Sequence, residues 1–398
     1  MILIVEKINL HPNKIISNCF FFYHQRISVP MNISFITTVN HNVGDDFVRE
    51  GLKFLLKNHF KGKNINFTSI HKHSPLTSTY GFERFKYLRL SKRVDKLIPK
   101  GFLKDRVLEA DLLIQSGAPV YWCHDIGGSH CYENEWFIPL IKKRFLKNDR
   151  SKLLNIAAGT CQKYHSDGSE FCNKCNNYIK DFYNLSTVTT LRDTLAKTVL
   201  SHDNIDAPVI PCSSIFACDE YGLKNEGSEY VIMNYMKGGA HYVFGQKIDF
   251  EKWENEFKKF YFEIKAKEHV ILSCHNKKEV DEALALDPKA EIFYKKDDFL
   301  AYMKFYSKAK FGIVNRVHAG FLMASFGKPS IVIGNDSRAR MLEEIGLKSY
   351  FVNDIDYALL MEQYEYLKSG ADNYSERFKI IKEKAYNDYM NALSALND

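Results

Sequence analysis

Short apolar runs alternate with longer helical patterns along most of the 398-residue chain, and this alternation restricts the fold more than any other feature of the sequence. Short aliphatic runs bounded by Gly, Asn or Ser are typical of buried strands. Helices between such strands indicate crossover connections in a parallel sheet, so the sequence predicts an α/β fold. The expected strands are residues 33–37, 112–115, 153–157, 188–191 and 208–210, followed by residues 230–233, 270–273, 291–294, 311–314 and 330–333.

A break between the two series of strands divides the chain into two domains. The segment YGLKNEG, residues 221–227, is polar and contains glycine, as linkers between domains do. We expect an N-terminal domain over residues 31–220, with a cysteine-rich insertion, and a C-terminal domain over residues 228–357. Residues 358–398 predict helices that brace the two domains, and residues 1–30 predict an extension outside the fold. Ligands of open α/β sheets bind beyond the carboxyl ends of the strands, so the expected site is a cleft between the domains.

The charge and hydropathy of the chain exclude several classes of function. Its 55 basic and 48 acidic residues give a net charge of +7, and the basic residues are scattered, without the arm or tract that binds nucleic acid. No stretch approaches the roughly 20 apolar residues of a transmembrane helix, and the apolar patch at residues 19–23 lacks the other parts of a signal peptide. The sequence therefore predicts a cytoplasmic protein that does not bind nucleic acid and is at most peripheral to a membrane. Its mild positive charge suits an acidic small substrate, although many soluble proteins share it.

The first stretch that can carry chemistry is TVNHNVGDD, residues 38–46, which follows the first expected strand and precedes a helix. Gly44 allows close approach of the backbone to a ligand, and the amides at a helix start favour an anion. Asn42 and Asp45 can cap the helix or bind a sugar hydroxyl. The stretch lacks the glycine spacing of a dinucleotide-binding loop, and a plain capped turn explains it equally well.

A second loop, SGAP at residues 116–119, also follows an expected strand. Gly117 and its small neighbours leave room for a ligand, and Tyr121, Trp122 and Trp136 offer flat faces on which a sugar ring can stack. Aromatic side chains that pack into the core explain the same pattern, so this loop alone does not define a site.

An arginine follows the expected strand at residues 188–191. The planar guanidinium of Arg192 can grip a carboxylate or a phosphate with two hydrogen bonds. Asp193 can instead pair with this arginine and cap the next helix, which leaves a structural role open for the pair.

The stretch after the expected strand at residues 311–314 combines three polar side chains with a small, apolar helix. Asn315, Arg316 and His318 stand at the start of that helix, where the backbone amides also attract anions. A histidine near neutral pKa can move a proton, and an arginine two residues before it can hold the charge of a substrate. A lone histidine is more often a satisfied core residue, but the pairing with Arg316 at a strand end favours function.

The order and spacing of these stretches resemble the polysaccharide pyruvyl transferase family, from about residue 31 to about residue 350. The resemblance implies an α/β fold of two Rossmann-like lobes that face a cleft, similar to the GT-B glycosyltransferases. Arg-Val-His-Ala is the most specific of the matching motifs. The matching residues are Asn42, Gly44, Asp45, Arg192, Asp193, Arg316, Val317, His318, Ala319, Gly327, Lys328, Pro329 and Asp336.

The resemblance also implies an activity, the transfer of a pyruvyl group from phosphoenolpyruvate to a saccharide as a ketal, in polysaccharide or glycan biosynthesis. In this interpretation His318 is the general acid, and Arg316 is the second catalytic residue. No cofactor is expected for catalysis. The expected donor-binding residues are Arg192, Asn315, Arg316 and His318, and the expected acceptor-binding residues are Asn42, Gly44, Asp45 and Gly117.

Two other functions fit the same sequence. A glycosyltransferase with a nucleotide-sugar donor shares the fold and would use the basic residues to hold a diphosphate. A carbohydrate-binding protein without catalysis would need neither Arg316 nor His318 for any turnover. Asp336 either faces the cleft or only caps the helix that follows it.

The chain has nine cysteines, and a Cys-x2-Cys knuckle at Cys172 and Cys175 indicates a metal site, because two thiolates on one tight turn can share a tetrahedral ion. This cysteine-rich insertion is not part of the family pattern. An iron-sulfur cluster or unligated thiols in a loop are the alternatives. The sequence predicts a structural zinc ion held by Cys161, Cys172, Cys175 and Cys212, with Cys218 and His165 as substitute ligands.

Overall fold

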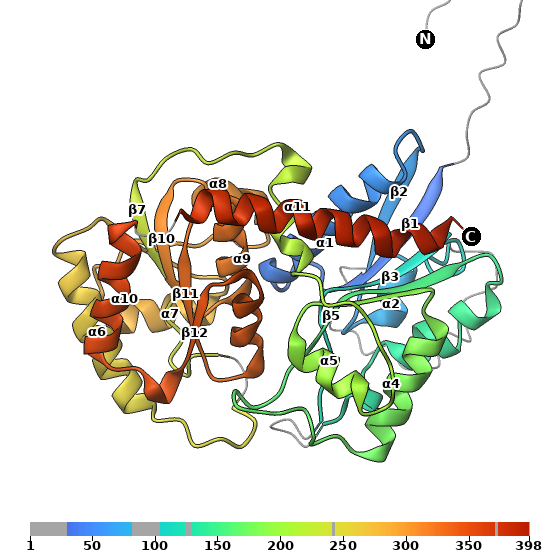
Figure 1. Ribbon diagram of the computed structural model, residues 1–398, viewed down its shortest axis with the longest axis horizontal. Helices are drawn as coiled ribbons and strands as arrows, with labels where there is room; N and C mark the ends of the chain where they lie inside the picture. Colours follow the sequence, from blue (N-terminus) through green and yellow to red (C-terminus); the bar gives the residue numbers. More distant parts are fainter. Residues whose placement is uncertain (1–29, 82–103, 124–128, 241–242, 371–372, 398) are drawn as a thin grey trace, which may run out of the picture.

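A computed structural model describes residues 30–81, 104–123, 129–240, 243–370 and 373–397 of the chain. It contains two parallel β-sheets, each with helices packed against it, in two lobes that lie side by side (Figure 1). The predicted α/β class with two lobes is confirmed. The predicted N-terminal extension falls outside the described residues, apart from Pro30.

The first sheet has the strand order β2-β1-β3-β5-β4, with β6 also paired to β5, and all of these pairings are parallel. Its central strands are buried on both faces, as the successive residues Leu113 and Ile114 of β3 show with no exposed surface. The strands are β1 (Met31–Thr37), β2 (Ile65–His71), β3 (Leu112–Ser116), β4 (Pro119–Tyr121), β5 (Lys152–Thr160) and β6 (Val188–Leu191). The helices of this lobe are α1 (Val43–His59), α2 (Pro75–Thr79), α4 (Asn173–Leu185) and α5 (Thr194–Ser201), with short turns η2 (Cys131–Glu133), η3 (Phe137–Lys142), η4 (Phe145–Lys147), η5 (Ser213–Phe216) and η6 (Asp219–Tyr221).

The second sheet has the strand order β12-β11-β10-β7-β8-β9 and is also parallel. Its strands are β7 (Tyr230–Met233), β8 (Val270–Ser273), β9 (Ile292–Phe293), β10 (Ala309–Val314), β11 (Ser330–Gly334) and β12 (Lys348–Phe351). The helices are α6 (Phe250–Lys265), α7 (Lys277–Leu286), α8 (Phe299–Tyr306), α9 (Val317–Ser325), α10 (Tyr357–Ser369) and α11 (Tyr374–Leu393), with short turns η7 (Ser337–Ile345), η8 (Val352–Asp354) and η9 (Ser394–Leu396).

Four segments differ from the strands expected from the sequence. Residues 208–210 do not form a strand, and only one parallel bridge joins Val209 to Leu191. The strands β2, β4 and β12 were not expected. Two of them, β2 and β12, are partly exposed edge strands with polar residues, and β4 has only three residues, so none of them has the apolar run of a buried strand.

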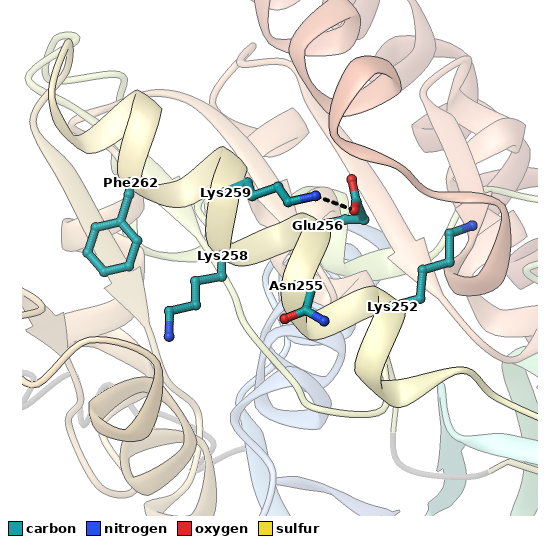
Figure 2. Close-up of a pocket in the computed structure, with 6 residues that line it drawn as sticks. All are labelled: Lys252, Asn255, Glu256, Lys258, Lys259 and Phe262. Carbon is teal, nitrogen blue, oxygen red and sulfur yellow. Dashed lines mark hydrogen bonds and ion pairs between the residues drawn. The ribbon is translucent and has the colours of Figure 1, made fainter.

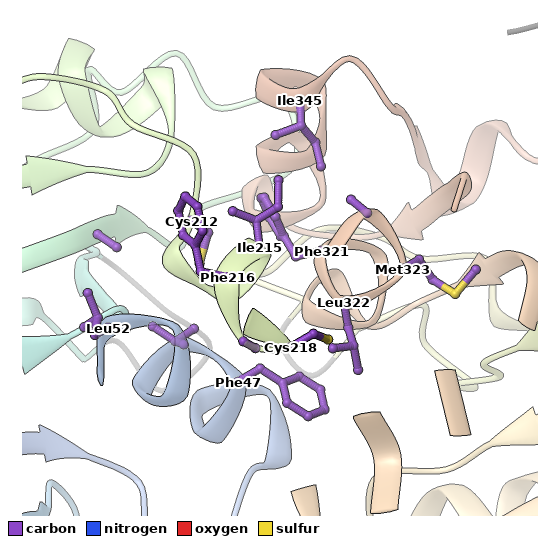
Figure 3. Close-up of a cluster of buried hydrophobic side chains, with 14 of the residues drawn as sticks. Phe47, Leu52, Cys212, Ile215, Phe216, Cys218, Phe321, Leu322, Met323 and Ile345 are labelled. Carbon is purple, nitrogen blue, oxygen red and sulfur yellow. The ribbon is translucent and has the colours of Figure 1, made fainter. Parts of the chain in front are cut away.

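One hydrophobic cluster runs from the first lobe into the second. Figure 3 shows side chains of α1, η5 and α9 meeting in it, among them Phe47, Ile215 and Phe321, all without exposed surface. Gly51 lets α1 approach the η5 backbone, since a Cβ there would lie 1.8 Å from the Ser213 carbonyl oxygen. The two sheets are therefore joined through packed helices as well as through the connecting chain.

The last long helix, α11, extends from the second lobe across the first (Figure 1). The Tyr389 hydroxyl near its end donates a hydrogen bond to the Pro211 carbonyl at 2.9 Å, and Lys152 donates to the Leu396 carbonyl at 3.1 Å. These bonds fix the C-terminal residues of the chain on the first lobe.

Within the described part of the chain, every helix is too short or too polar to span a bilayer.

Candidate functional site at the strand ends of both lobes

The start of α1 presents a buried carboxylate, that of Asp45. Asn42 is the N-cap, and its Oδ1 accepts a hydrogen bond from the Gly44 amide at 3.2 Å. Asp45 accepts from the Thr38 hydroxyl at 2.8 Å and from the Asn42 side-chain amide at 3.2 Å, and Lys72 lies 3.5 Å away. Burial opposes ionisation of Asp45. The charge of Lys72, the nearby His318 of the other lobe and the Thr38 hydrogen bond outweigh this effect and lower the pKa of Asp45 to about 2. Asp45 is therefore a carboxylate at neutral pH.

Arg192 follows β6 and is 1% exposed. Its Nη1 donates to the carbonyl oxygen of Gly117, which lies in the turn after β3, and lies 3.4 Å from His318 Nε2. The neighbouring Asp193 is occupied elsewhere, because it caps α5 and accepts hydrogen bonds from the amide and hydroxyl of Thr160. Among the described residues no carboxylate lies within ion-pair distance of Arg192, and its buried Nε has no acceptor.

His318 stands in the first turn of α9 and reaches the other lobe. Its ring packs on the start of α1, since a Cβ at Gly44 would lie 2.6 Å from His318 Nδ1. Burial and the positive charge of Arg192 lower the pKa of His318 to about 3, against a smaller opposing effect of Asp45. The imidazole is therefore neutral at pH 7, and the contact with Arg192 makes Nε2 the acceptor and Nδ1 the protonated nitrogen.

Arg316 is the N-cap residue of α9, but its side chain does not cap the helix. Its guanidinium pairs with Glu279 at the start of α7, a carboxylate that also accepts hydrogen bonds from the Asn276 side chain and the His275 amide. The positive charge of Arg316 also acts on His318 and helps to lower its pKa. Arg316 is thus held in a fixed place near the histidine.

The structure changes the assignment of Asn315. Its side-chain oxygen accepts from the Met236 amide at 2.9 Å, and its nitrogen donates to the Ile333 carbonyl at 2.8 Å. Both ends of the amide are used to tie the ends of β7 and β11 to the start of α9. We therefore assign Asn315 to the positioning of Arg316 and His318 rather than to donor binding.

Asp336 caps η7, where it accepts a hydrogen bond from the Arg338 amide at 3.0 Å. The guanidinium of Arg338 closes on the same carboxylate through contacts of 2.8 and 2.7 Å, and its charge acts on His318. Of the two roles that the sequence left open for Asp336, the structure thus supports the cap.

Three histidine rings lie close to one another, and the charge of Asp45 acts on one of them, His73. The centroids of His41, His71 and His73 are 5.8 to 6.0 Å apart. Burial and the neighbouring Lys72 lower the pKa of His73 to about 4, while Asp45 opposes the shift. His71 is the last residue of β2 and Lys72 follows it. Because the sequence did not predict β2, it could not indicate that these residues lie near Asp45.

Sequence reasoning missed four charged or polar members of the site, Thr38, Lys72, Glu279 and Arg338. Thr38 comes directly after β1, and Arg338 lies two residues after Asp336, the cap of η7, so the sequence shows both positions. Lys72 depends on the missed strand β2. Glu279 follows the expected strand β8 by six residues, and nothing in the sequence indicates that it pairs with Arg316.

The structure corrects the predicted metal ligands. Cys212 lies in the hydrophobic cluster shared by the lobes and accepts a hydrogen bond from the Ser214 hydroxyl at 3.3 Å. Cys161 follows β5, and its backbone amide donates a hydrogen bond to the Tyr121 carbonyl. Neither joins the knuckle. Within the described residues, the group of side chains that could hold an ion is Cys123, His130, Cys172 and Cys175.

A hollow on the surface lies on another part of the molecule (Figure 2). Its lining comes from one face of the outer helix α6, and two of its charged side chains, Lys259 and Glu256, form an ion pair of 2.8 Å. No strand-end residue contributes to it. The lining residues are Lys252, Asn255, Glu256, Lys258, Lys259 and Phe262.

Comparisons with known proteins agree with this geometry. Two solved structures of UDP-N-acetylglucosamine 2-epimerases share the fold at a TM-score of 0.50: one from Listeria monocytogenes is 11% identical and covers 88% of this chain and 91% of its own, and another is 13% identical and covers 88% and 90%. At such identities the likeness concerns the fold alone, and it confirms the expected GT-B-like architecture. The search of curated proteins found no significant match.

A family model matches residues 42–337, most of the chain, and this segment contains Asn42, Asp45, Arg192, Arg316 and His318. The model is described as polysaccharide pyruvyl transferase. The protein is therefore a transferase that belongs to the polysaccharide pyruvyl transferase family.

Proposed function

We propose that this protein transfers the pyruvyl group of phosphoenolpyruvate to two hydroxyls of a saccharide, with release of inorganic phosphate. The observation that carries the proposal is Arg192, a buried guanidinium that makes no direct ion pair among the described residues and lies 3.4 Å from His318 of the other lobe. The charges of Asp193 and Asp45 act on it only from a distance. A buried charge without a direct partner is unfavourable unless an anion compensates it. Family membership supports the reaction, and the lack of a direct ion pair at Arg192 supports an anionic donor.

Phosphoenolpyruvate fits this charge distribution because it carries a phosphate and a carboxylate. Arg192 from the first lobe and Arg316 from the second supply two guanidinium groups whose charges act on His318, and a guanidinium can hold an oxyanion with paired hydrogen bonds. The start of α9 adds the positive end of a helix beside the same histidine. We assign the donor to this group of residues.

The chemistry requires a proton at the methylene carbon of the donor. Protonation turns the methylene into a methyl group and makes the adjacent carbon electrophilic; one sugar hydroxyl adds to that carbon, and a second hydroxyl displaces phosphate. The two hydroxyls lose two protons in total; one is balanced by the proton that enters the new methyl group, and the other goes to the released phosphate. His318 is our candidate for the proton donor.

Because its pKa is low, His318 can donate a proton only after it has taken one up. Without a donor, burial and the charge of the arginines keep the imidazole neutral, whereas a bound dianion cancels the charge of the arginines and raises the pKa. Donor binding would therefore be coupled to proton uptake by His318. Asp45, which is ionised, offers a hydrogen-bond acceptor to the saccharide hydroxyls, and its low pKa makes it an orienting group rather than a strong base.

The proposal is tested by determining which donor the protein uses. The purified protein is incubated with carbon-labelled phosphoenolpyruvate and a panel of mono- and oligosaccharides, and phosphate release and transfer of label to the sugar are measured together. We expect both in equal amounts with a suitable acceptor. Parallel reactions contain nucleotide-sugars instead. Turnover of a nucleotide-sugar without any use of phosphoenolpyruvate would overturn the proposal in favour of a glycosyltransferase.

A further inference from the structure

Four side chains from two segments that are distant in sequence bring their ligand atoms together in the first lobe. Cys123, His130, Cys172 and Cys175 each offer one atom, and these atoms all lie within 4.8 Å of one another. We propose that they bind one structural zinc ion. The proposal is independent of the reaction that the protein catalyses.

The separations match those of ligands around a single tetrahedral ion. His130 Nδ1 lies 3.2, 3.8 and 3.9 Å from the sulfur atoms of Cys123, Cys172 and Cys175. Bond lengths of about 2.3 Å to sulfur and about 2.0 Å to nitrogen place tetrahedral ligands about 3.5 to 3.8 Å apart. The ion therefore fits between these atoms with only small movements of the side chains.

The backbone prepares the site from two sides. Cys123 comes two residues after β4, and the Cys131 amide donates to the Trp122 carbonyl at 3.1 Å, which brings His130 back beside Cys123. Cys172 is the N-cap of α4, and Cys175 lies in the first turn of that helix.

The helix start also suits the charge of the site. Three thiolates around Zn²⁺ leave a net negative charge, which the positive end of α4 stabilises. The Cys172 amide donates a hydrogen bond to Cys123 Sγ at 3.4 Å, an arrangement that favours the thiolate form of this ligand.

The ligand set favours zinc in a closed, structural site. Four protein ligands fill a tetrahedron and leave no position for a substrate, unlike the three ligands and a water of catalytic zinc. A cluster of several irons would spread its cysteines around a larger body than one ion, and it usually takes four cysteines. The site would join Cys123, two residues after β4, to the start of α4.

The first experiment uses the wild-type protein, so it does not depend on how a variant folds. Protein purified without added metal is analysed for zinc and iron, and the zinc is then exchanged for Co²⁺. We expect about one zinc per chain and, after exchange, the intense visible absorption of tetrahedral cobalt with thiolate charge-transfer bands. Only trace zinc, iron in its place, or the weak spectrum of six-coordinate cobalt would overturn the proposal.

The second experiment identifies the ligands with matched cysteine variants. Cys172→Ser should lose most of its zinc, whereas Cys212→Ser, which removes a buried thiol outside the group, should keep it. Circular dichroism restricts the comparison to folded protein. If Cys172→Ser does not fold, X-ray absorption at the zinc edge of the wild type decides instead, with three sulfurs and one nitrogen expected. Loss of zinc from Cys212→Ser alone, or a four-sulfur shell, would contradict this ligand set.

Discussion

At the scale of single residues, the site depends on one neutral imidazole and one buried guanidinium from different lobes. Arg192 cannot lose its charge, so the repulsion between two buried positive charges is avoided by His318. Burial and the charge of Arg192 lower the pKa of His318 to about 3. The resting protein is therefore organised to take up an anion before it takes up a proton. This order of events leads to two predictions.

Removal of the guanidinium should weaken use of the donor. Arg192→Met keeps the length and apolar part of the side chain but removes the charge, so we expect kcat/KM for phosphoenolpyruvate to fall by about 100-fold or more, a typical loss for a group that stabilises transition-state charge. Steady-state kinetics measures the effect. Arg150→Met, at an exposed position, is the control and should change little. Equal activity of the two variants would remove Arg192 from the site.

The pH dependence of stability should report on His318. The unfolded chain binds a proton near pH 6.5 and the folded protein only near pH 3, so the unfolded state holds more protons between these values. The contribution of His318 to stability is complete above about pH 6.5 and is lost as the pH falls toward 3. Urea unfolding of wild type and His318→Gln from pH 7.5 to 4.5 measures it, and the variant should lose less stability on acidification.

A histidine titration followed by NMR gives a direct check of the same prediction. In the free protein the resonance assigned to His318, which is the one absent from His318→Gln, should not titrate near neutral pH. Addition of phosphoenolpyruvate should raise its pKa. A normal midpoint near 6.5 in the free protein would contradict the electrostatic coupling to Arg192.

At the scale of elements, α1 is the piece that connects the site to the core. Its first turn carries Gly44 and Asp45, and its middle packs on η5 through Gly51. The same helix therefore sets both the distance to His318 and the distance to the segment that links the sheets. Small residues at the two contact points are required because backbone or ring atoms approach closely there.

Gly51→Ala should destabilise the protein, although Gly51 itself lies outside the site. The new methyl group would overlap the Ser213 carbonyl oxygen and force α1 and η5 apart, with a cost of about 1–3 kcal/mol or more, as for other overpacked positions. Chemical denaturation measures the loss. Asn58→Ala, on an exposed position of the same helix, should change the free energy of unfolding by about 0.5 kcal/mol or less. A neutral Gly51→Ala would mean that the contact is looser than described.

The elements also show how far the sequence alone could predict the molecule. Buried strands such as β3 and β10 were found from their apolar runs, and β6 from its β-branched residues between turn signals. Arg192 and His318 were found because they follow the ends of β6 and β10. Edge strands carry polar residues and were missed, which concealed Lys72. The prediction of the metal ligands was wrong for a related reason. Cys123 follows β4, a strand that was not expected, and nothing in the sequence shows that Cys123 and His130 lie beside Cys172 and Cys175.

At the scale of the whole molecule, the two lobes share a hydrophobic cluster and are spanned by α11. Domains that share so much buried surface are expected to lose their structure together. The fold is thus closer to one cooperative unit than to two domains on a linker.

The three tryptophans allow a test of this cooperativity. Trp122 and Trp136 lie in the first lobe, and Trp253 is buried in the second. In Trp253→Phe the fluorescence reports the first lobe, and in the double variant Trp122→Phe/Trp136→Phe it reports the second. Each urea transition should coincide with the one that circular dichroism gives for the same variant. Two separated transitions in one protein would show independent lobes.

The contact between Arg192 and His318 has a consequence for turnover. A phosphate group cannot fit between atoms 3.4 Å apart, with the ring already resting on Gly44. Donor entry therefore requires the imidazole to swing aside or the lobes to shift, and product exit requires the reverse. The rate of turnover would then depend on this conformational step as well as on the chemical step, so kcat should fall when sucrose raises the viscosity of the solvent.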